Sequence, residues 1–483
     1  MKFLFSICVL CLFFAGNAIS QDSVFIRSYG LTGYNYGEKI IQDADTGFLI
    51  LGNKSGFVGN TDVYLVKTNK YGNLVWDKAF GSDEINWADD FIFTSENKYV
   101  IAGYLSIPAN NNDYNFMLIN ADADGNMLWM KNYGGNNWDI AHSIIETTDG
   151  GFIIVGETYS FGKGNNDVYI LKTNKDGDSL WSKTYGGINN DVAYDINKCH
   201  DGNYIITGYT NSFGKGEYDA YLLKINSSGD TLWTKTYGDL LDDKAYAGIE
   251  TKDHGIIFAG STKNYNVQNQ DGIILKVDSL GNYLWKQLIN GQENEDLSDI
   301  IQDKHENFFF VGYTESYGYV GSKDFSISYR DKDGNFITGI TYGGEKQDYA
   351  NACINTNTGG YAIVGTTESM GPGISNILVI KMDSLLHTNS TNYIHVLDIS
   401  EQEKNDIIIY PNPVSEYLFI NISETNTLKN ISIYNITGNI IFQKEIDNYN
   451  NLSIGFKEIP EGVYIIRLQY KDRIITQKII HTK

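Results

Sequence analysis

Proline is scarce in this sequence. The 483 residues include 5 prolines against 49 glycines, so the turns must be built largely from Gly, Asn and Asp. Aromatic residues are abundant by contrast, with 35 tyrosines and 23 phenylalanines. Because aromatic side chains favour strands over helices, the composition predicts an all-β protein. A hydrophobic fraction of 42% supports large cores and more than one domain.

Positive charge is also in short supply. The chain has 37 Lys and Arg against 59 Asp and Glu, and its net charge is -22 at pH 7. Binding to nucleic acid or to anionic lipid needs clustered Lys and Arg. The charge balance therefore excludes nucleic acid as a partner.

Long hydrophobic runs are confined to the opening stretch, MKFLFSICVLCLFFAGNAISQ. Lys2 supplies the charged start, Phe3 to Ala15 the apolar run, and Ala18 to Ser20 a small-residue cleavage site. The run is shorter than the ~20 residues of a membrane span. We predict a signal peptide at residues 1–20 rather than a retained anchor, no transmembrane span after its removal, and export through the periplasm.

Cysteine is rare as well. Two of the 4 cysteines lie in the predicted signal peptide, which leaves Cys199 and Cys353. These two fall at different positions of repeats that are three units apart. We therefore expect two free thiols and no disulfide framework.

What the chain has in quantity is a repeat. The stretch SLWSKTYGG, which begins at Ser179, returns as MLWMKNYGG and TLWTKTYGD. Its tryptophan and a later glycine mark seven units with spacings of 51 to 53 residues. The tryptophan position is held by Phe25, Trp76, Trp129, Trp181, Trp233, Trp285 and Thr338. The glycine position is held by Gly52, Gly103, Gly156, Gly208, Gly260, Gly312 and Gly365.

Each unit contains four short strands separated by turns rich in Gly, Asn and Asp. Four strands in a repeat of about 50 residues indicate a blade of a β-propeller. The repeats begin with a lone outer strand at 24–30 and end one strand short at 376–383. We predict a seven-bladed β-propeller over residues 21–384 whose ring is closed by the first strand, because closure leaves no blade edge unpaired at the seam. The pattern resembles the short propeller-type repeats of exported bacterial surface proteins.

The period stops after Ser384, and residues 385–406 are interpreted as a linker. Residues 407–483 contain six or seven short strands, typical of a small Ig-like β-sandwich. This part resembles the type A sorting domain of the type IX secretion system. The resemblance rests on an N-x-x-G turn from Asn435 to Gly438 and on Tyr410, Pro411, Asn412, Pro413, Gly462, Tyr464, Lys478 and Lys483. It implies handling by the type IX machinery and a location that is secreted or on the outer cell surface. An accessory sandwich without an export role is the alternative.

Two sets of polar residues recur with the repeat. The first, ten residues after each tryptophan position, is Asp139, Asp191, Asp243, Glu295 and Asp348, with Asn35 and Asn86 in the first two units. As the start of the innermost strand, it would surround one mouth of the channel, where carboxylates could hold Ca²⁺ or a polyhydroxylated ligand. Capping of backbone N–H groups is the more economical interpretation. The second set, Asp62, Asn115, Asp167, Asp219, Asp271, Asp324 and Asn376, exchanges Asp for Asn freely and is expected to cap backbone amides.

No catalytic motif is found. The seven histidines show no metal-binding spacing, and the sequence has no G-x-S-x-G, P-loop or dinucleotide fingerprint. We therefore assign no catalytic residue, no metal site and no cofactor beyond calcium at the first set.

The sequence favours a binding or adhesion scaffold for an extracellular glycan or protein. A glycoside hydrolase or polysaccharide lyase is the enzyme alternative, since propellers bring carboxylates together from different blades. A purely structural surface component is the third. Catalysis would need one blade to differ from the rest, so function is expected in the residues that fail to repeat.

Overall fold

The computed structural model describes residues 24–481 except for the segments 31, 56–60, 82–84, 108–112, 265–266, 320, 389–394, 398–406, 411–413, 415–416, 423–427, 436–439, 446–450, 458 and 471–473. The predicted signal peptide lies outside the described residues. Within them the regular structure is entirely β-strand.

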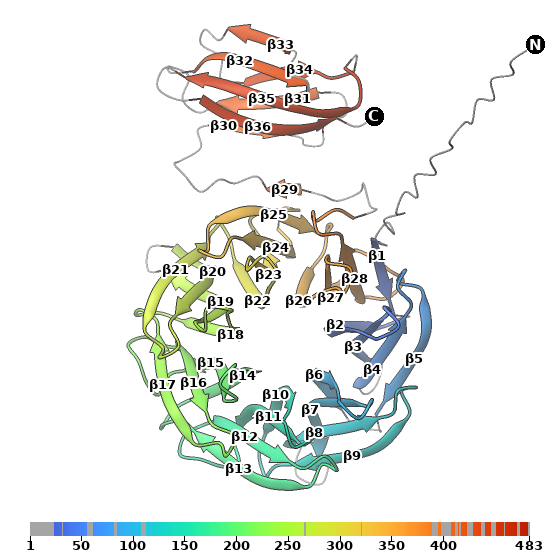
Figure 1. Ribbon diagram of the computed structural model, residues 1–483, viewed down its shortest axis with the longest axis vertical. Helices are drawn as coiled ribbons and strands as arrows, with labels where there is room; N and C mark the ends of the chain where they lie inside the picture. Colours follow the sequence, from blue (N-terminus) through green and yellow to red (C-terminus); the bar gives the residue numbers. More distant parts are fainter. Residues whose placement is uncertain are drawn as a thin grey trace, which may run out of the picture.

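Seven sheets, six of four strands and one of five, are arranged radially around a central axis, which confirms the predicted seven-bladed propeller (Figure 1). Blade one contains β2 (Tyr34–Gln42), β3 (Phe48–Ser55), β4 (Thr61–Thr68) and β5 (Leu74–Phe80). Blade two contains β6 (Asn86–Phe93), β7 (Tyr99–Ile107), β8 (Asp113–Ala121) and β9 (Met127–Tyr133). Blade three contains β10 (Asp139–Glu146), β11 (Phe152–Thr158), β12 (Asp167–Thr173) and β13 (Ser179–Tyr185). Blades four and five are formed by β14 (Asp191–Lys198), β15 (Tyr204–Thr210), β16 (Asp219–Ile225) and β17 (Thr231–Tyr237); and β18 (Asp243–Glu250), β19 (Ile256–Asn264), β20 (Val267–Val277) and β21 (Tyr283–Ile289). Blade six contains β22 (Glu295–Gln302), β23 (Phe308–Thr314), β24 (Asp324–Arg330) and β25 (Phe336–Tyr342), and blade seven contains β26 (Asp348–Asn355), β27 (Tyr361–Thr367) and β28 (Asn376–Met382).

The ring is closed by the N-terminal strand. β1 (Phe25–Tyr29) pairs antiparallel with β28, with Phe25 opposite Lys381 and Tyr29 opposite Ile377. β1 thereby supplies the outer strand that the last repeat lacks. The closure predicted from the phase of the repeat is confirmed.

The hydrophobic core lies between the blades. Each buried cluster of the propeller combines residues of two adjacent blades, as Ile153 and Ile170 of blade three do with Ile206 and Leu223 of blade four. The second strand of each blade is buried on both faces, for example over Phe152–Val155. Each blade is therefore stabilised chiefly by its neighbours.

The outer strands join successive blades through the repeated LW-x-K-x-Y residues. The Trp181 ring lies against the backbone of Gly229, in the hairpin turn of the next blade. Lys183 pairs with Asp230 at 2.7 Å, and the Tyr185 hydroxyl donates to the Gly229 carbonyl. The repeated Trp, Lys and Tyr therefore join each blade to the next.

The predicted linker contributes one strand to the propeller. β29 (His395–Leu397) pairs antiparallel with Gly339–Thr341 of β25 and makes blade six five-stranded. Ile340 and Thr341 of β25 are buried. Because β29 covers β25, this outer strand does not need the LW-x-K-x-Y residues of the other outer strands. This accounts for Thr338 at the tryptophan position.

The C-terminal part forms two sheets, as a small sandwich requires. One contains β30 (Ile407–Tyr410), β31 (Tyr417–Ile422) and β34 (Asn451–Gly455), and the other β32 (Leu428–Asn435), β33 (Ile440–Glu445), β35 (Gly462–Tyr470) and β36 (Ile474–His481). Its own core includes Leu418, Ile431, Phe456 and Ile466. Cys199 and Cys353 are free thiols, as predicted, and both are buried in the propeller.

Candidate functional site

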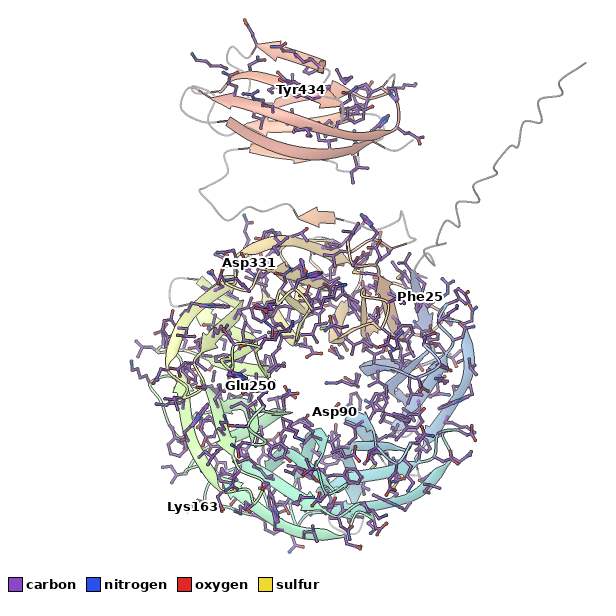
Figure 2. All side chains as sticks on the ribbon, viewed as in Figure 1. Phe25, Asp90, Lys163, Glu250, Asp331 and Tyr434 are labelled. Carbon is purple, nitrogen blue, oxygen red and sulfur yellow. The ribbon has the colours of Figure 1, made fainter. Side chains whose placement is uncertain are left out.

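The innermost strands of all seven blades surround a cavity of about 370 Å³ on the propeller axis. Its lining is charged and aromatic, unlike the apolar interfaces between the blades; Asp90 is labelled beside it in Figure 2. The lining residues are Glu38, Lys39, Asp89, Asp90, His142, Ser143, Tyr194, Asp195, Tyr246, Ala247, Asp296, Ser298, Asp299 and Asn351. We call this cavity the central channel.

A β-bulge places one residue of every innermost strand out of register with its partner strand. In β10 the pairing to β11 shifts between Ala141 and Ser143, so His142 has no paired residue. The same shift occurs at the same position of the other six blades. The seven bulge residues are Glu38, Asp89, His142, Tyr194, Tyr246, Ser298 and Asn351. Bulges redirect side chains, and all seven of these line the central channel.

The bulge residues are where the repeat breaks down. Five of the seven blades have alanine directly before the bulge, as at Ala141 and Ala193. The bulge position itself holds Glu, Asp, His, Tyr, Tyr, Ser and Asn in turn. A shared backbone thus presents a set of side chains that differs from blade to blade. This is the property that a single asymmetric site requires.

The next residue of each strand forms a second layer that joins the blades. Asp90 accepts the backbone N–H of Ile144 at 3.1 Å, and Asp195 accepts that of Gly248 at 3.0 Å. Asp299 accepts the backbone N–H of Cys353 at 2.9 Å. Each bond crosses to the following blade. These three carboxylates therefore have a structural role as well as a place in the channel lining.

Lys39 supplies positive charge within this layer. Its ammonium lies 3.7 Å from Asp90 Oδ1. The pKa of Lys39 is raised, first by Asp90 and further by Asp299 and Asp195, although burial opposes the charge. Lys39 is therefore the counter-ion of Asp90, Asp195 and Asp299, which come from blades two, four and six.

His142 is the second cation of the channel. Its Nδ1 lies 2.8 Å from Asp89 Oδ2, and its Nε2 lies 3.7 Å from Glu157 Oε1. Burial alone would lower the pKa of His142, but these two carboxylates raise it to about 9. The ring stacks on Tyr194 with centroids 4.7 Å apart. At neutral pH His142 is therefore an imidazolium held between Asp89, Glu157 and the ring of Tyr194.

Other carboxyl groups of the channel hold their protons unusually well. Burial, with a contribution from Asp89, raises the pKa of Glu38 to about 8. Burial raises the pKa of Asp296 to about 7. Asp296 Oδ2 accepts a hydrogen bond from Gln270 at 3.0 Å, whereas its buried Oδ1 has no partner among the described residues. Asp296 thus contributes to the lining a carboxyl group that holds its proton more readily than an exposed one.

The structure places the first predicted set at the start of the innermost strands, but not in the lining of the channel. Asp139 is fully buried and accepts hydrogen bonds from the Gly135 N–H and the Ser160 hydroxyl, both at 2.8 Å. Equivalent backbone contacts are made by Asp191, Asp243 and Asp348. Burial raises the pKa of Glu295, which accepts from Thr314, to about 7. These contacts favour capping over calcium binding, which stays a prediction.

The second predicted set also contacts backbone amides. Asp167 Oδ2 accepts from the N–H groups of Lys163 and Gly164, at 2.6 and 3.0 Å. Asp219 accepts from Lys215 and Gly216 in the same way, and Asn376 accepts from Gly373. Burial raises the pKa of Asp324, which accepts from Tyr319, to about 6. Asp62, Asn115 and Asp271 hold the same repeat position but lie within the third strands β4, β8 and β20.

Part of the predicted sorting motif can be placed in the sandwich. Gly462 begins β35 at φ 155°, and the buried Tyr464 donates to the Pro460 carbonyl at 2.6 Å. Tyr410 ends β30 and Lys478 lies in β36. Pro411, Asn412, Pro413 and Lys483 lie outside the described residues.

Sequence reasoning missed the bulge residues because it followed what repeats. A signal was present, since these residues lie 13 positions after each tryptophan anchor, at the point where aligned units disagree most in charge and size. Whether these side chains reach the channel depends on the β-bulge. The alternation of side chains along a strand does not predict where a bulge occurs.

Among known protein families, the one described as the secretion system C-terminal sorting domain matches residues 408–482. The resemblance to a type IX sorting domain is thereby confirmed. The domain indicates export by the type IX machinery, followed by secretion or attachment to the cell surface. In the part of the chain that the structure describes, no helix has the length and hydrophobicity to cross a membrane.

Three solved structures of low sequence identity have similar folds. Puromycin hydrolase is 9% identical, with a TM-score of 0.46 over 89% of this chain and 58% of that chain. The Pan2 WD40 domain of Neurospora crassa is 9% identical, with a TM-score of 0.44 over 72% of this chain and 89% of that chain. The extracellular domain of a hybrid two-component system from B. thetaiotaomicron is 11% identical, with a TM-score of 0.35 over 92% of this chain and 68% of that chain. No curated protein matches the sequence.

Proposed function

We propose that this exported propeller is a binding scaffold whose ligand enters the central channel. The observation that carries the proposal is the ring of seven bulge residues, which differ from blade to blade in an otherwise repetitive molecule. A ring that only stabilised the fold would be expected to repeat, as the capping Asp and Asn residues do.

The chemistry of the channel favours a polyhydroxylated ligand, a glycan. Carboxyl groups of the lining, such as those of Asp89 and Asp296, can accept hydrogen bonds from hydroxyl groups. Tyr194 and Tyr246, whose rings are 5.2 Å apart, present aromatic surface for the apolar face of a sugar. In blade two, Trp87 donates from its indole to Asp89 at 2.7 Å and packs against Tyr36, with ring centroids 5.3 Å apart. Small polar pockets with aromatic walls and a few oriented acceptors are typical of ligand sites.

The charge of the channel selects among glycans. Six acidic and two basic side chains line the cavity. An anionic sugar would meet like charges in a partly enclosed space, where screening is weak. Neutral and amino sugars are therefore expected to bind in preference to uronic acids or sulfated sugars.

Aromatic loops extend the proposed surface onto one face of the disc. Trp138 is 48% exposed, Phe161 44% and Phe213 45%. All three lie in loops that enter or leave the blades on the side where the innermost strands begin. Exposed aromatic side chains grouped on one face support a binding role there.

A glycan array probed with the purified propeller tests this proposal. Binding of neutral or amino glycans, with little binding of uronic-acid polymers, is the expected result. A second array with Asp296→Asn, which keeps the shape of the side chain, should show loss of the same signals. Asp230→Asn, which removes an exposed carboxylate paired with Lys183 on the outer rim, is the matched control. Binding that is identical in both variants would contradict the proposal.

A glycan-active enzyme is the second candidate. Asp296 favours it, because a buried carboxyl group with a pKa of about 7 and one unpartnered oxygen has the properties of a general acid. Polysaccharide hydrolysis should then appear in a substrate screen and fall at least a hundredfold in Asp296→Asn. Glycan binding without turnover would contradict the enzyme candidate and support the binding scaffold.

A further inference from the structure

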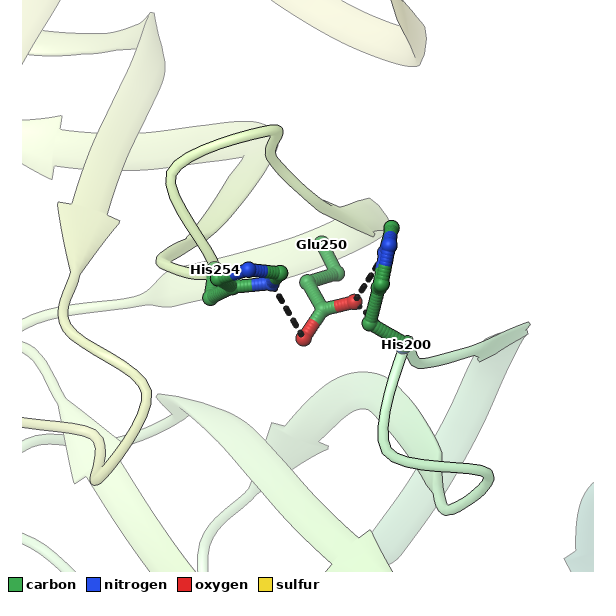
Figure 3. A group of neighbouring side chains, drawn as sticks. All are labelled: His200, Glu250 and His254. Carbon is green, nitrogen blue, oxygen red and sulfur yellow. Dashed lines mark hydrogen bonds and ion pairs between the residues drawn. The ribbon is translucent and has the colours of Figure 1, made fainter.

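We propose that His200, Glu250 and His254 form a binding site for a divalent transition metal of the zinc class. The three side chains come from two blades and meet at the junction of blades four and five (Figure 3). His200 lies in the turn after β14, Glu250 ends β18, and His254 lies in the turn after β18. The site is separate from the central channel and does not depend on the function proposed for it.

The donor atoms converge on a single point. One ligand atom from each of the three side chains lies within 4.8 Å of the others. His200 Nδ1 is 3.8 Å from Glu250 Oε2, and His254 Nδ1 is 4.0 Å from Glu250 Oε1. The two imidazoles thus face different oxygens of one carboxylate, as Figure 3 shows.

Two imidazoles and a carboxylate are a donor set that zinc prefers, with metal–ligand distances of about 2.0–2.2 Å. The donors are somewhat farther apart than they would be around a bound ion. The side chains of His200 and His254 are 76% and 55% exposed, so small rotations of these rings would bring them in. Glu250, at 9% exposure, is the fixed member.

The backbone that carries the histidines is already held in place. Buried Lys224 pairs with Asp201 in the first turn at 2.8 Å, and buried Lys276 pairs with Asp253 in the second. These pairs fix the turns and leave the imidazoles as the moving parts. Little ordering of the chain would then be needed on metal binding.

The junction of blades two and three shows what the site would look like without histidine. There the Ser95 N–H donates to Glu146 Oε2 at 2.9 Å, as the His200 N–H donates to Glu250 Oε2 at 2.5 Å. The carboxylate therefore has a structural role in both junctions. The two histidines are what distinguishes the junction of blades four and five.

His254 occupies a position that is unfavourable for a side chain. Its φ is +64°, whereas Gly150 and Gly202, at the same turn position of blades three and four, have φ of +77° and +79°. A left-handed conformation is strained for a residue other than glycine. Thr46, Asn97 and Glu306 hold the same turn position in blades one, two and six at φ of +66°, +61° and +69°, so this strain is not peculiar to His254, and its replacement by glycine is expected to relieve it.

Three protein ligands leave at least one coordination position open. Histidine spacing along the sequence did not predict this site, because its two imidazoles approach each other across a blade boundary.

Calorimetric titration of Zn²⁺ into the tag-free full chain tests the proposal. We expect one strong site per chain. His254→Gly and Glu250→Gln should each weaken it at least tenfold. Glycine is native at this turn position in blades three, four and seven, and Gln302 holds the place of Glu250 in blade six, where it accepts the Lys252 N–H at 3.0 Å. Both substitutions therefore keep the fold.

His305→Ala, in the corresponding turn of blade six, is the control for exposed histidines and should leave the affinity unchanged. A second readout separates metal binding from a structural effect. Without metal, His254→Gly should melt at the same temperature as the wild type or higher, and zinc should raise only the wild-type midpoint. Zinc affinity that is absent in the wild type, or equal in His254→Gly, would overturn the proposal.

Discussion

At the scale of single residues, contact between a tryptophan and a glycine sets the spacing of the blades. Gly229 has φ +77°, and a Cβ added to it would lie 2.7 Å from the Trp181 ring. Gly202 has nearly the same φ, +79°, but a Cβ there would meet nothing within 4 Å. The two glycines therefore separate backbone strain from the contact between blades.

Alanine at both positions should show this difference. Gly202→Ala is expected to lower the free energy of unfolding by about 1–2 kcal/mol through strain alone. Gly229→Ala should lose about 1–3 kcal/mol more, because the methyl group overpacks against Trp181. Urea denaturation of the two variants measures both values. Equal losses would show that the tryptophan contact adds nothing.

The bulge residues and the two histidines also show where sequence reasoning ends at this scale. The identity of His142 or Tyr194 was readable, but its direction was set by a bulge that no turn or spacing announced. His200 and His254 show no metal-binding spacing along the chain, since each belongs to its own repeat. Contacts between repeats depend on the curvature of the ring. The local sequence pattern does not predict that curvature.

At the scale of elements, β1 is the part on which the ring depends. Phe25 and Tyr29 are buried in the cluster that joins blades seven and one, and the Tyr29 hydroxyl donates to the Gly72 carbonyl at 2.7 Å. This strand was predictable, because the repeat begins out of phase. β29 was not, since His395–Leu397 carries no alternation and pairs only because β25 has an edge to cover.

Removal of β1 should open the ring. A chain that starts at residue 31 is expected to melt at a lower temperature than one that starts at residue 24, and to aggregate, because the edge of β28 is then unpaired. A synthetic peptide of residues 24–30 added in trans should restore part of the midpoint. Thermal melts of both chains, with and without the peptide, measure this. An unchanged midpoint would contradict closure by β1.

At the scale of the whole molecule, the central channel makes stability depend on pH. Glu38, Asp195 and Asp296 have pKa values of about 8, 6 and 7, above those of an unfolded chain, and His142 has a pKa of about 9. The folded state therefore holds protons that the unfolded state has released. By linkage, stability falls as the pH rises from about 5 to 9.

The opposite sign applies in acid. Burial opposes charge at Asp201 and Asp253, but their lysine partners lower both pKa values to about 2. Their contribution is lost as the pH falls from about 4 towards 2. Melting temperatures recorded across this range should peak between about pH 4 and 6, and Glu38→Gln with Asp296→Asn should flatten the alkaline side. A maximum above pH 8 would contradict the assignment.

The sorting domain belongs to the same scale. Deletion of residues 410–483 should leave the propeller folded in the periplasm, because the sandwich has its own core. Fractionation of cells that express the full and the shortened chain measures the location of each. Secretion of the shortened chain would contradict the sorting role.

The central claim is that a ring of unlike residues on a repeated backbone forms one binding site. Calorimetric titration of the oligosaccharide with the strongest array signal tests it most directly. We predict at least a tenfold loss of affinity in the double variant Glu38→Gln, Asp296→Asn and unchanged affinity in Asp230→Asn, as expected when buried acceptors are removed. Equal affinities in all three proteins would place the ligand outside the channel and contradict the claim.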